Sequence, residues 1–140
     1  MKVTVCELNA DSEKLAIAWD GLVDHVKAHG SDLVLLPEMP FYPWFGASPD
    51  FNEKVWQLSV AAHDLWQERL IDLAPAVVLS TRPVNVVGQR SNEGFRWEKE
   101  AGYTKAHTNI TCRTSRASGR PTGTVGATAP SIRCNLSEPK

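Results

Sequence analysis

The stretch DLVLLPEMPFYPWF, residues 32–45, joins an apolar strand pattern to a loop that contains one carboxylate and four aromatic residues. Residues 33–37 form an unbroken apolar run, which is typical of a strand covered on both faces in a sheet flanked by helices. Glu38 follows directly, between two prolines that stiffen the loop. Ligands of open α/β sheets bind at the carboxyl ends of the strands, so Glu38 is a candidate site residue. Its alternative role is structural, as a loop cap or as the partner of a surface lysine.

Four aromatic residues follow this carboxylate: Phe41, Tyr42, Trp44 and Phe45. Burial among aromatic groups removes water from a carboxylate and disfavours its charged form. A carboxyl group in such a setting can act as a general base near neutral pH. The loop therefore predicts an acid–base site around Glu38.

The segments before this loop predict a βαβ unit. Residues 2–8 are rich in Val and Thr and are predicted as a strand. An apolar stripe then follows at the spacing of one helix face, with Leu15, Trp19, Leu22, Val23 and Val26. This helix is predicted to end at Gly30, before the strand at residues 33–36.

The segments after the loop predict a second helix and further strands. Asp50 and Glu53 form a capping-box pattern that opens a helix, and Pro75 ends it. The predicted apolar face consists of Val55, Leu58, Ala62, Leu65, Trp66, Arg69 and Leu73. Residues 76–80 are predicted as a strand, and residues 92–97, the EKEAG turn and YTKAH as a hairpin. The predicted fold class is α/β, in the order β-α-β-α-β-β.

Composition and charge exclude several classes of protein. The 140 residues carry a formal net charge of -1, so no global field favours nucleic acid or an anionic membrane. No apolar run approaches the roughly 20 residues of a bilayer span, and no signal peptide is visible, so we expect a cytoplasmic protein. The cysteines Cys6, Cys112 and Cys134 are odd in number and lack metal-ligand spacing, so no metal site is predicted. Cys6 is expected to be a small buried residue in the first strand.

The composition changes abruptly near residue 108. All eleven aromatic residues lie before this point, and the remainder of the chain has a single acidic residue, Glu138. The remainder shows no sustained period of two or 3.6 residues and is predicted to be disordered. The chain therefore divides into residues 1–108 and a low-complexity tail at residues 109–140.

Residues 1–108 resemble the nitrilase superfamily of carbon–nitrogen hydrolases. The resemblance rests on the V-x-V strand, the amphipathic helix, G-S-D-L-V-L-L-P-E, the V-V-L-S strand, and a hairpin with N-E-G-F and Y-T-K-A-H. It implies the N-terminal portion of an α-β-β-α sandwich, and catalysis by a glutamate, a lysine and a cysteine that forms a thioester. It also implies a small amide, carbamoyl amide or nitrile substrate, no cofactor, and assembly into a homo-oligomer.

The resemblance assigns roles to particular residues. Glu38 matches the general base, and the four aromatic residues of its loop would form a wall of the substrate pocket. Lys105, in Y-T-K-A-H, is the candidate for the lysine that stabilises the tetrahedral intermediate, and its alternative role is a solvated lysine at a strand end. Neither Cys112 nor Cys134 lies in the family's C-x-[DE]-x-R setting, so the nucleophile is missing.

A changed reading frame is one explanation of the tail. With suitable codons, NITCRTSRASGRPTG read from its third base becomes HHLPDEQGFWEANW, which restores acidic and aromatic residues. Loss of one base just after Thr108 would then have placed Asn109 where the family lysine stood, and Lys105 would be a bystander. The alternative is a genuine low-complexity tail.

Two functions follow from these patterns. The first is a carbon–nitrogen hydrolase of which this chain is an N-terminal part without its nucleophile, and therefore inactive as it stands. The second is a non-catalytic small-molecule-binding or interaction module that uses the pocket around Glu38, Trp44 and Phe45. A nucleotide-binding domain ranks third because no glycine-rich phosphate loop follows the first strand. Without the second sheet of the sandwich, an apolar sheet face would lack a partner, and we expect marginal folding or self-association.

Overall fold

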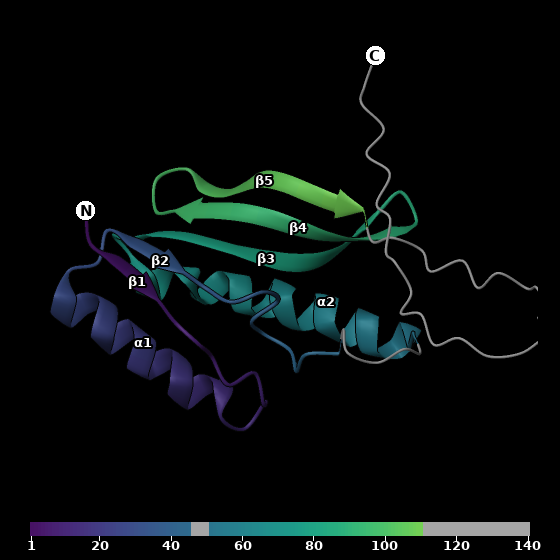
Figure 1. The fold of residues 1–140 in the computed structure, drawn as a ribbon, viewed down its shortest axis with the longest axis horizontal. Helices are drawn as coiled ribbons and strands as arrows, with labels where there is room; N and C mark the ends of the chain where they lie inside the picture. The colour runs from purple at the N-terminus through teal and green to yellow at the C-terminus, as the bar shows by residue number, and fades with distance from the viewer. Residues whose placement is uncertain (46–50, 111–140) are drawn as a thin grey trace, which may run out of the picture. The chain divides into compact units, whose positions relative to one another are not determined.

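The computed structural model describes residues 1–45 and 51–110, which form one mixed sheet with helices on one face (Figure 1). The elements are β1 (Val3–Val5), α1 (Leu15–His29), β2 (Leu33–Leu35), α2 (Glu53–Gln67), the 3₁₀ helix η1 (Glu68–Leu73), β3 (Val77–Val86), β4 (Gln89–Glu98) and β5 (Gly102–Ile110). None of the helices in these ranges combines the length and the apolar character that a membrane crossing requires. The predicted α/β class is confirmed.

The five strands lie in the order β1-β2-β3-β4-β5, with a parallel half and an antiparallel half. β1, β2 and β3 pair in parallel, and β3, β4 and β5 form an antiparallel meander. The predicted order is one strand short, because the predicted hairpin of residues 92–97 and YTKAH supplies two strands, β4 and β5. β3 also continues past its predicted end at Ser80 to Val86 and forms a hairpin with β4. β3 extends beyond its short neighbour β2, so Pro83 lies where the strand has one open side, a position that tolerates proline. The tail predicted at residues 109–140 begins two residues too early, because Asn109 and Ile110 belong to β5. Residues 111–140 lie outside the described residues.

Helix α1 follows its sequence pattern closely. All five residues of the predicted stripe are buried, and Trp19 has no exposed surface. The helix ends where expected, because Gly30 adopts φ 61°, a left-handed conformation that glycine accepts readily. The backbone N–H of Gly30 donates to the carbonyl of Val26 and closes the last turn.

The predicted apolar face of the second helix is wrong at Leu58 and Leu65, whereas Leu73 is buried and Trp66 packs against the core as expected. Leu58 and Leu65 are 47% and 68% exposed, and the side chains that face the sheet are Trp56, Ser59 and His63. The chain then changes to the 3₁₀ helix η1, whose shorter period brings Leu70 and Leu73 into the core. Apolar residues occupy two sides of α2, so periodicity alone does not identify the inner side. The helix cap is also different, because Asn52 Oδ1 accepts from the N–H of Val55 at 3.2 Å.

The sheet has one covered face and one open face. Thr4, Val34 and Val78 point toward the helices and are buried. Their neighbours along the strands point the other way and lie in two rows across β1, β2 and β3, namely Val3–Leu33–Val77 and Val5–Leu35–Leu79. Val5 is 73% exposed. This open apolar face is the one expected from a single layer of the predicted sandwich, whose second sheet is not among the described residues.

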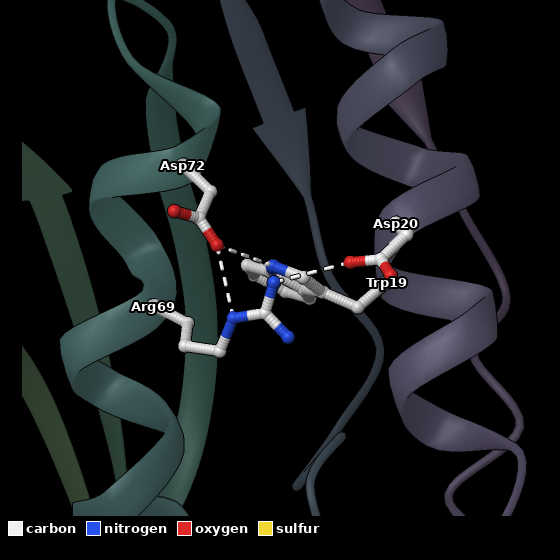
Figure 2. A network of polar contacts seen from close by, with 4 residues as sticks. All are labelled: Trp19, Asp20, Arg69 and Asp72. Atoms are coloured by element: carbon white, nitrogen blue, oxygen red, sulfur yellow. Dashed lines mark hydrogen bonds and ion pairs between the residues drawn. The ribbon is translucent and has the colours of Figure 1, made fainter.

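A polar network joins α1 to η1 around the buried Trp19 (Figure 2). The indole Nε1 of Trp19 donates to Asp72 Oδ2 at 3.2 Å, and the same oxygen accepts from Arg69 Nε at 3.0 Å. Arg69 Nη2 also donates to Asp20 Oδ1 at 3.1 Å, and its guanidinium lies 5.2 Å from the ring centre of Trp66. Asp72 therefore satisfies the one polar group of Trp19, the largest of the fully buried side chains.

Replacing Asp72 with alanine should destabilise the fold by about 1–3 kcal/mol, because the Trp19 N–H would stay buried without an acceptor. Asp20→Ala is the matched control, since it removes a carboxylate from the same arginine but at a 68% exposed position. This control should change the unfolding free energy by less than about 0.5 kcal/mol. Urea unfolding followed by tryptophan fluorescence measures both, and equal effects would contradict the role of Asp72.

Candidate functional site

The loop that carries Glu38 is anchored to the neighbouring strand β3. The hydroxyl of Ser80 donates to the carbonyl of Pro37 at 3.1 Å, and the N–H of Met39 donates to Thr81 Oγ1 at 3.1 Å. Met39 has φ 45°, an uncommon conformation for a residue with a side chain. These two bonds flank Glu38 and fix the turn at the carboxyl end of β2.

Glu38 is held by a residue from the far side of the sequence. Its Oε1 accepts a hydrogen bond from Asn92 Nδ2 at 2.7 Å, and Asn92 belongs to β4. The Glu38 side chain is exposed. The expected burial of this carboxylate among aromatic rings is therefore wrong, because the nearest of those rings turns into the core. Asn92 opens the N-E-G-F stretch on which the resemblance rests, but no sequence pattern paired it with Glu38, which is 54 positions away.

The four aromatic residues of the loop separate into three environments. Phe41 is only 4% exposed and packs in the core against Trp19 and Trp66, so it forms no pocket wall. Tyr42 and Trp44 do line an open cavity of about 330 Å³ together with Glu38. The other lining residues are Leu8, Ala10, Pro37, Met39 and Pro40.

Phe45 lies apart from this cavity. Its ring meets Trp56 of α2 edge-on at 6.1 Å and lies 6.2 Å from the ring of Tyr42. Because it contacts both α2 and a lining residue, Phe45 supports the cavity without forming its wall.

His63 ties the aromatic loop to α2, a role that the sequence did not suggest. Its Nδ1 donates to the carbonyl of Ser59 at 2.7 Å, and its Nε2 accepts from the N–H of Phe41 at 3.3 Å. Burial lowers the pKa of His63 to about 4, so the ring is neutral at physiological pH. Neutral imidazole is required here because a protonated Nε2 could not accept the Phe41 hydrogen bond.

Lys105 lies on the other side of the sheet from Asn92. Its Nζ is 3.7 Å from Glu93 Oε2, and Glu93 also accepts a hydrogen bond from the hydroxyl of Tyr103. Burial, and then this bond, raises the pKa of Tyr103. Glu93 and Asn92 are consecutive residues of one strand, so their side chains point to opposite faces. The structure does not bring Lys105 and Glu38 together.

The residue opposite Asn92 on β5 is Asn109. The antiparallel register pairs Asn92 with Asn109 and Glu93 with Thr108. The register therefore pairs position 109 of β5 with the residue that holds Glu38.

Cys6 is unsuited to nucleophilic chemistry. It follows β1 directly, and its Sγ donates to the carbonyl of Leu35 at 3.6 Å. Burial raises the pKa of the thiol to about 11, so the reactive thiolate is scarce at neutral pH. Cys112 and Cys134 lie outside the described residues. Within the described ranges, no group of three or more His, Cys, Asp or Glu side chains could hold a metal ion.

Solved structures of a carbon–nitrogen hydrolase, an NAD(+) synthetase and an amidase share this fold over part of their length. A carbon-nitrogen hydrolase from Helicobacter pylori G27 matches over 79% of this chain and 39% of its own, with a TM-score of 0.60 and 19% identity. A glutamine-dependent NAD(+) synthetase from Cytophaga hutchinsonii matches over 73% of this chain and 17% of its own, with a TM-score of 0.52 and 14% identity. A mutant amidase from Nesterenkonia sp. AN1, with the acetamide moiety of fluoroacetamide covalently added at its active-site cysteine, matches over 79% and 42%, with a TM-score of 0.52 and 16% identity.

The likeness is one of fold. No protein-family model and no curated protein matches the sequence. The chain spans less than half the length of each of the three solved chains. The described part of this chain therefore has a fold that is also found in part of a carbon–nitrogen hydrolase and in part of an amidase.

Proposed function

We propose that this chain carries the general-base part of a carbon–nitrogen hydrolase site, with Glu38 as the base. The observation that carries the proposal is the position of Glu38, which lies at the carboxyl end of β2, faces an open cavity and accepts a hydrogen bond from Asn92. The shared fold supports the reaction class. The substrate would be a small amide, carbamoyl amide or nitrile, within reach of Tyr42 and Trp44.

The chemistry requires two groups besides the base. A general base removes the proton of a cysteine thiol, whose sulfur attacks the substrate carbon, and later activates the water that hydrolyses the thioester. A cation stabilises the charge that develops on the tetrahedral intermediate. Cys6 does not meet the first need, because its thiol stays protonated. We therefore propose that the chain as it stands is inactive.

Position 109 is the proposed place of the missing cation. It lies opposite Asn92 in the β-ladder, whereas Lys105 pairs with Glu93 on the other face. A reading frame restored by one base would put a lysine at this position. The register supports Asn109 as the site of this lost lysine and Lys105 as a bystander.

The test compares the present chain with a protein encoded after one base is inserted following codon 108 and the downstream gene is completed, so that the nucleophilic cysteine is supplied. The present chain should release no ammonia from simple amides, and the frame-restored protein should do so. In the restored protein, Glu38→Gln should lower turnover by about 10²-fold or more. Glu13→Gln, a change of the same kind at an exposed glutamate, is the control and should leave turnover unchanged.

Two results would contradict the proposal. The first is turnover by the present chain that disappears on changing Cys112 or Cys134. The second is a restored protein in which Glu38→Gln and Glu13→Gln behave alike.

A small-molecule-binding module is the second candidate, because the cavity beside Glu38 is open in a chain that offers no suitable thiolate among its described residues. Saturable binding of an amide to the present chain, lost in Glu38→Gln, together with an inactive restored protein, would favour this alternative.

A further inference from the structure

The cavity beside Glu38 lies at the carboxyl ends of two neighbouring parallel strands. β1 pairs with β2, and the chain after β1 supplies Leu8 and Ala10 to the lining, while the loop after β2 supplies the rest. The volume of about 330 Å³ is at the small end of the range for ligand sites in proteins. The cavity therefore suits a substrate whose acyl group is about the size of one ring.

The charge of this cavity has one sign. Of the described residues that line it, only Glu38 carries a charge. Lys105 gives no compensation, because its Nζ lies 3.7 Å from Glu93 Oε2 on the other side of the sheet from Asn92. A carboxylate on a ligand would therefore meet a like charge in the cavity, with no cation in the described lining to offset the repulsion.

The carboxylate of Glu38 is held in place by its neighbours. Asn92 Nδ2 donates to Glu38 Oε1 at 2.7 Å. The residues before and after Glu38 are bonded to β3 through the carbonyl of Pro37 and the N–H of Met39. Because the backbone and the side chain are both tethered, Glu38 cannot turn away from a negative ligand without breaking a hydrogen bond.

The apolar part of the lining includes two aromatic rings with a common support. The ring of Phe45 stacks on that of Trp44, with 6.5 Å between the ring centres, and meets that of Tyr42 edge-on at 6.2 Å. Trp44 is 56% exposed, so its indole offers surface to a ligand. Rings that are already held in position lose little conformational entropy when a ligand binds.

We propose that the cavity beside Glu38 takes uncharged amides with an apolar, ring-sized acyl group and rejects substrates that carry a carboxylate. The inference rests on the proposed function for its reaction and on the cavity for its choice of substrate. It excludes carbamoyl amides with a free carboxylate, which would bring two negative charges together. The same repulsion favours product release, because hydrolysis converts the neutral amide and water into a carboxylate and ammonium.

The test measures the binding of three probes of similar size to the full chain, since binding does not require the nucleophile. Benzamide, benzoate and benzamidine share one ring and are neutral, negative and positive at neutral pH. In ligand-observed NMR titrations, benzoate should bind at least about tenfold more weakly than benzamide, and benzamidine should bind no more weakly than benzamide. Benzoate that binds as tightly as benzamide, benzamidine that binds more weakly, or an absence of benzamide binding would overturn the proposal.

Removing the charge should remove the discrimination. Glu38→Gln keeps the shape of the side chain, so the dissociation constants of benzoate and benzamidine should come within about threefold of each other. Glu13→Gln, at an exposed glutamate outside the lining, is the control and should keep the wild-type order. Equal behaviour of the two variants would show that Glu38 does not set the preference.

Removing the larger ring should weaken all three probes. Trp44→Ala should raise the dissociation constant of benzamide by about tenfold, because a stacking surface is lost. Phe51→Ala is the matched control, since it removes an aromatic ring that is 53% exposed and does not line the cavity. If both variants bind benzamide alike, the acyl group does not pack on Trp44, and the proposal fails.

These experiments fail separately from those on the reaction. A wrong order of the three probes, with turnover in the restored protein that depends on Glu38, would contradict the substrate class alone. Turnover in the restored protein that is unaffected by Glu38→Gln would contradict the general-base proposal, whatever the order of the probes.

Discussion

Trp19→Ala should lower the free energy of unfolding by about 3–5 kcal/mol, the largest effect expected of any single substitution in the described residues. Trp19 has no exposed surface, and its ring meets Phe41 edge-on at 5.7 Å and Trp66 edge-on at 5.6 Å. The alanine variant would leave a cavity between α1, η1 and the aromatic loop. It would also leave Asp72 without its indole donor.

Trp44→Ala is the matched control for this prediction, because it removes the same side chain at a position that is 56% exposed. Its effect on unfolding should stay within about 0.5 kcal/mol, as for most surface substitutions. Urea unfolding followed by circular dichroism measures both variants, since the signal does not depend on the tryptophans that are removed. Similar midpoints for the two variants would show that Trp19 is not the centre of the core.

Acidification from pH 6.5 to pH 4 should destabilise the protein by about 3 kcal/mol through His63 alone. The folded-state pKa of His63 is about 4, and the unfolded value is 6.5. Between these values the unfolded chain binds a proton that the folded chain excludes, so stability falls as the pH falls. Above pH 6.5 the ring is neutral in both states and the contribution is complete.

The variant that tests this prediction is His63→Gln, which cannot take up a proton in this range. At pH 7.5 its unfolding free energy should be lower than that of the wild type. Between pH 6.5 and pH 4, the unfolding free energy of this variant should fall less steeply with pH, because the contribution of His63 is absent. His25→Gln, at an exposed position on α1, should keep the wild-type slope. Identical slopes for the wild type and His63→Gln would show that His63 accepts a proton in the folded state as easily as in the unfolded one.

How far the fold follows from the sequence depends on the element. The pattern of α1 is decisive because its apolar residues occupy one side and Gly30 ends it. α2 is ambiguous because Leu58 and Leu65 form a second apolar side. The buried side is decided by contacts with residues distant in sequence, those of Trp56 with β3 and of His63 with the aromatic loop. The spacing of apolar residues shows which sides of a helix are apolar, but it does not show which of these sides packs against the sheet.

The candidate site shows a similar division. The position of Glu38 at a strand end follows from the apolar run before it, but its bond to Asn92 depends on the pairing of distant strands. The face of Lys105 depends on a bulge between Gly94 and Phe95, which places Lys105 opposite Phe95. Without that bulge the register of Asn92 and Asn109 would set Lys105 opposite Arg96, on the face of Asn92. A single extra residue in one strand thus decides whether this lysine can approach Glu38.

The unequal halves of the sheet determine the order in which the site can be assembled. β3, β4 and β5 are linked by short turns and pair along most of their length, so their contacts close with little loss of chain entropy. β1 and β2 pair over only three residues, and so do β2 and β3. In the sequence, a helix lies between the two strands of each pair. The meander therefore offers a nucleus on which the parallel strands dock later, and it also opens last when the protein fluctuates. Asn92 belongs to the early, persistent part and Glu38 to the late, easily opened part, so local opening separates this pair before the rest of the sheet unfolds.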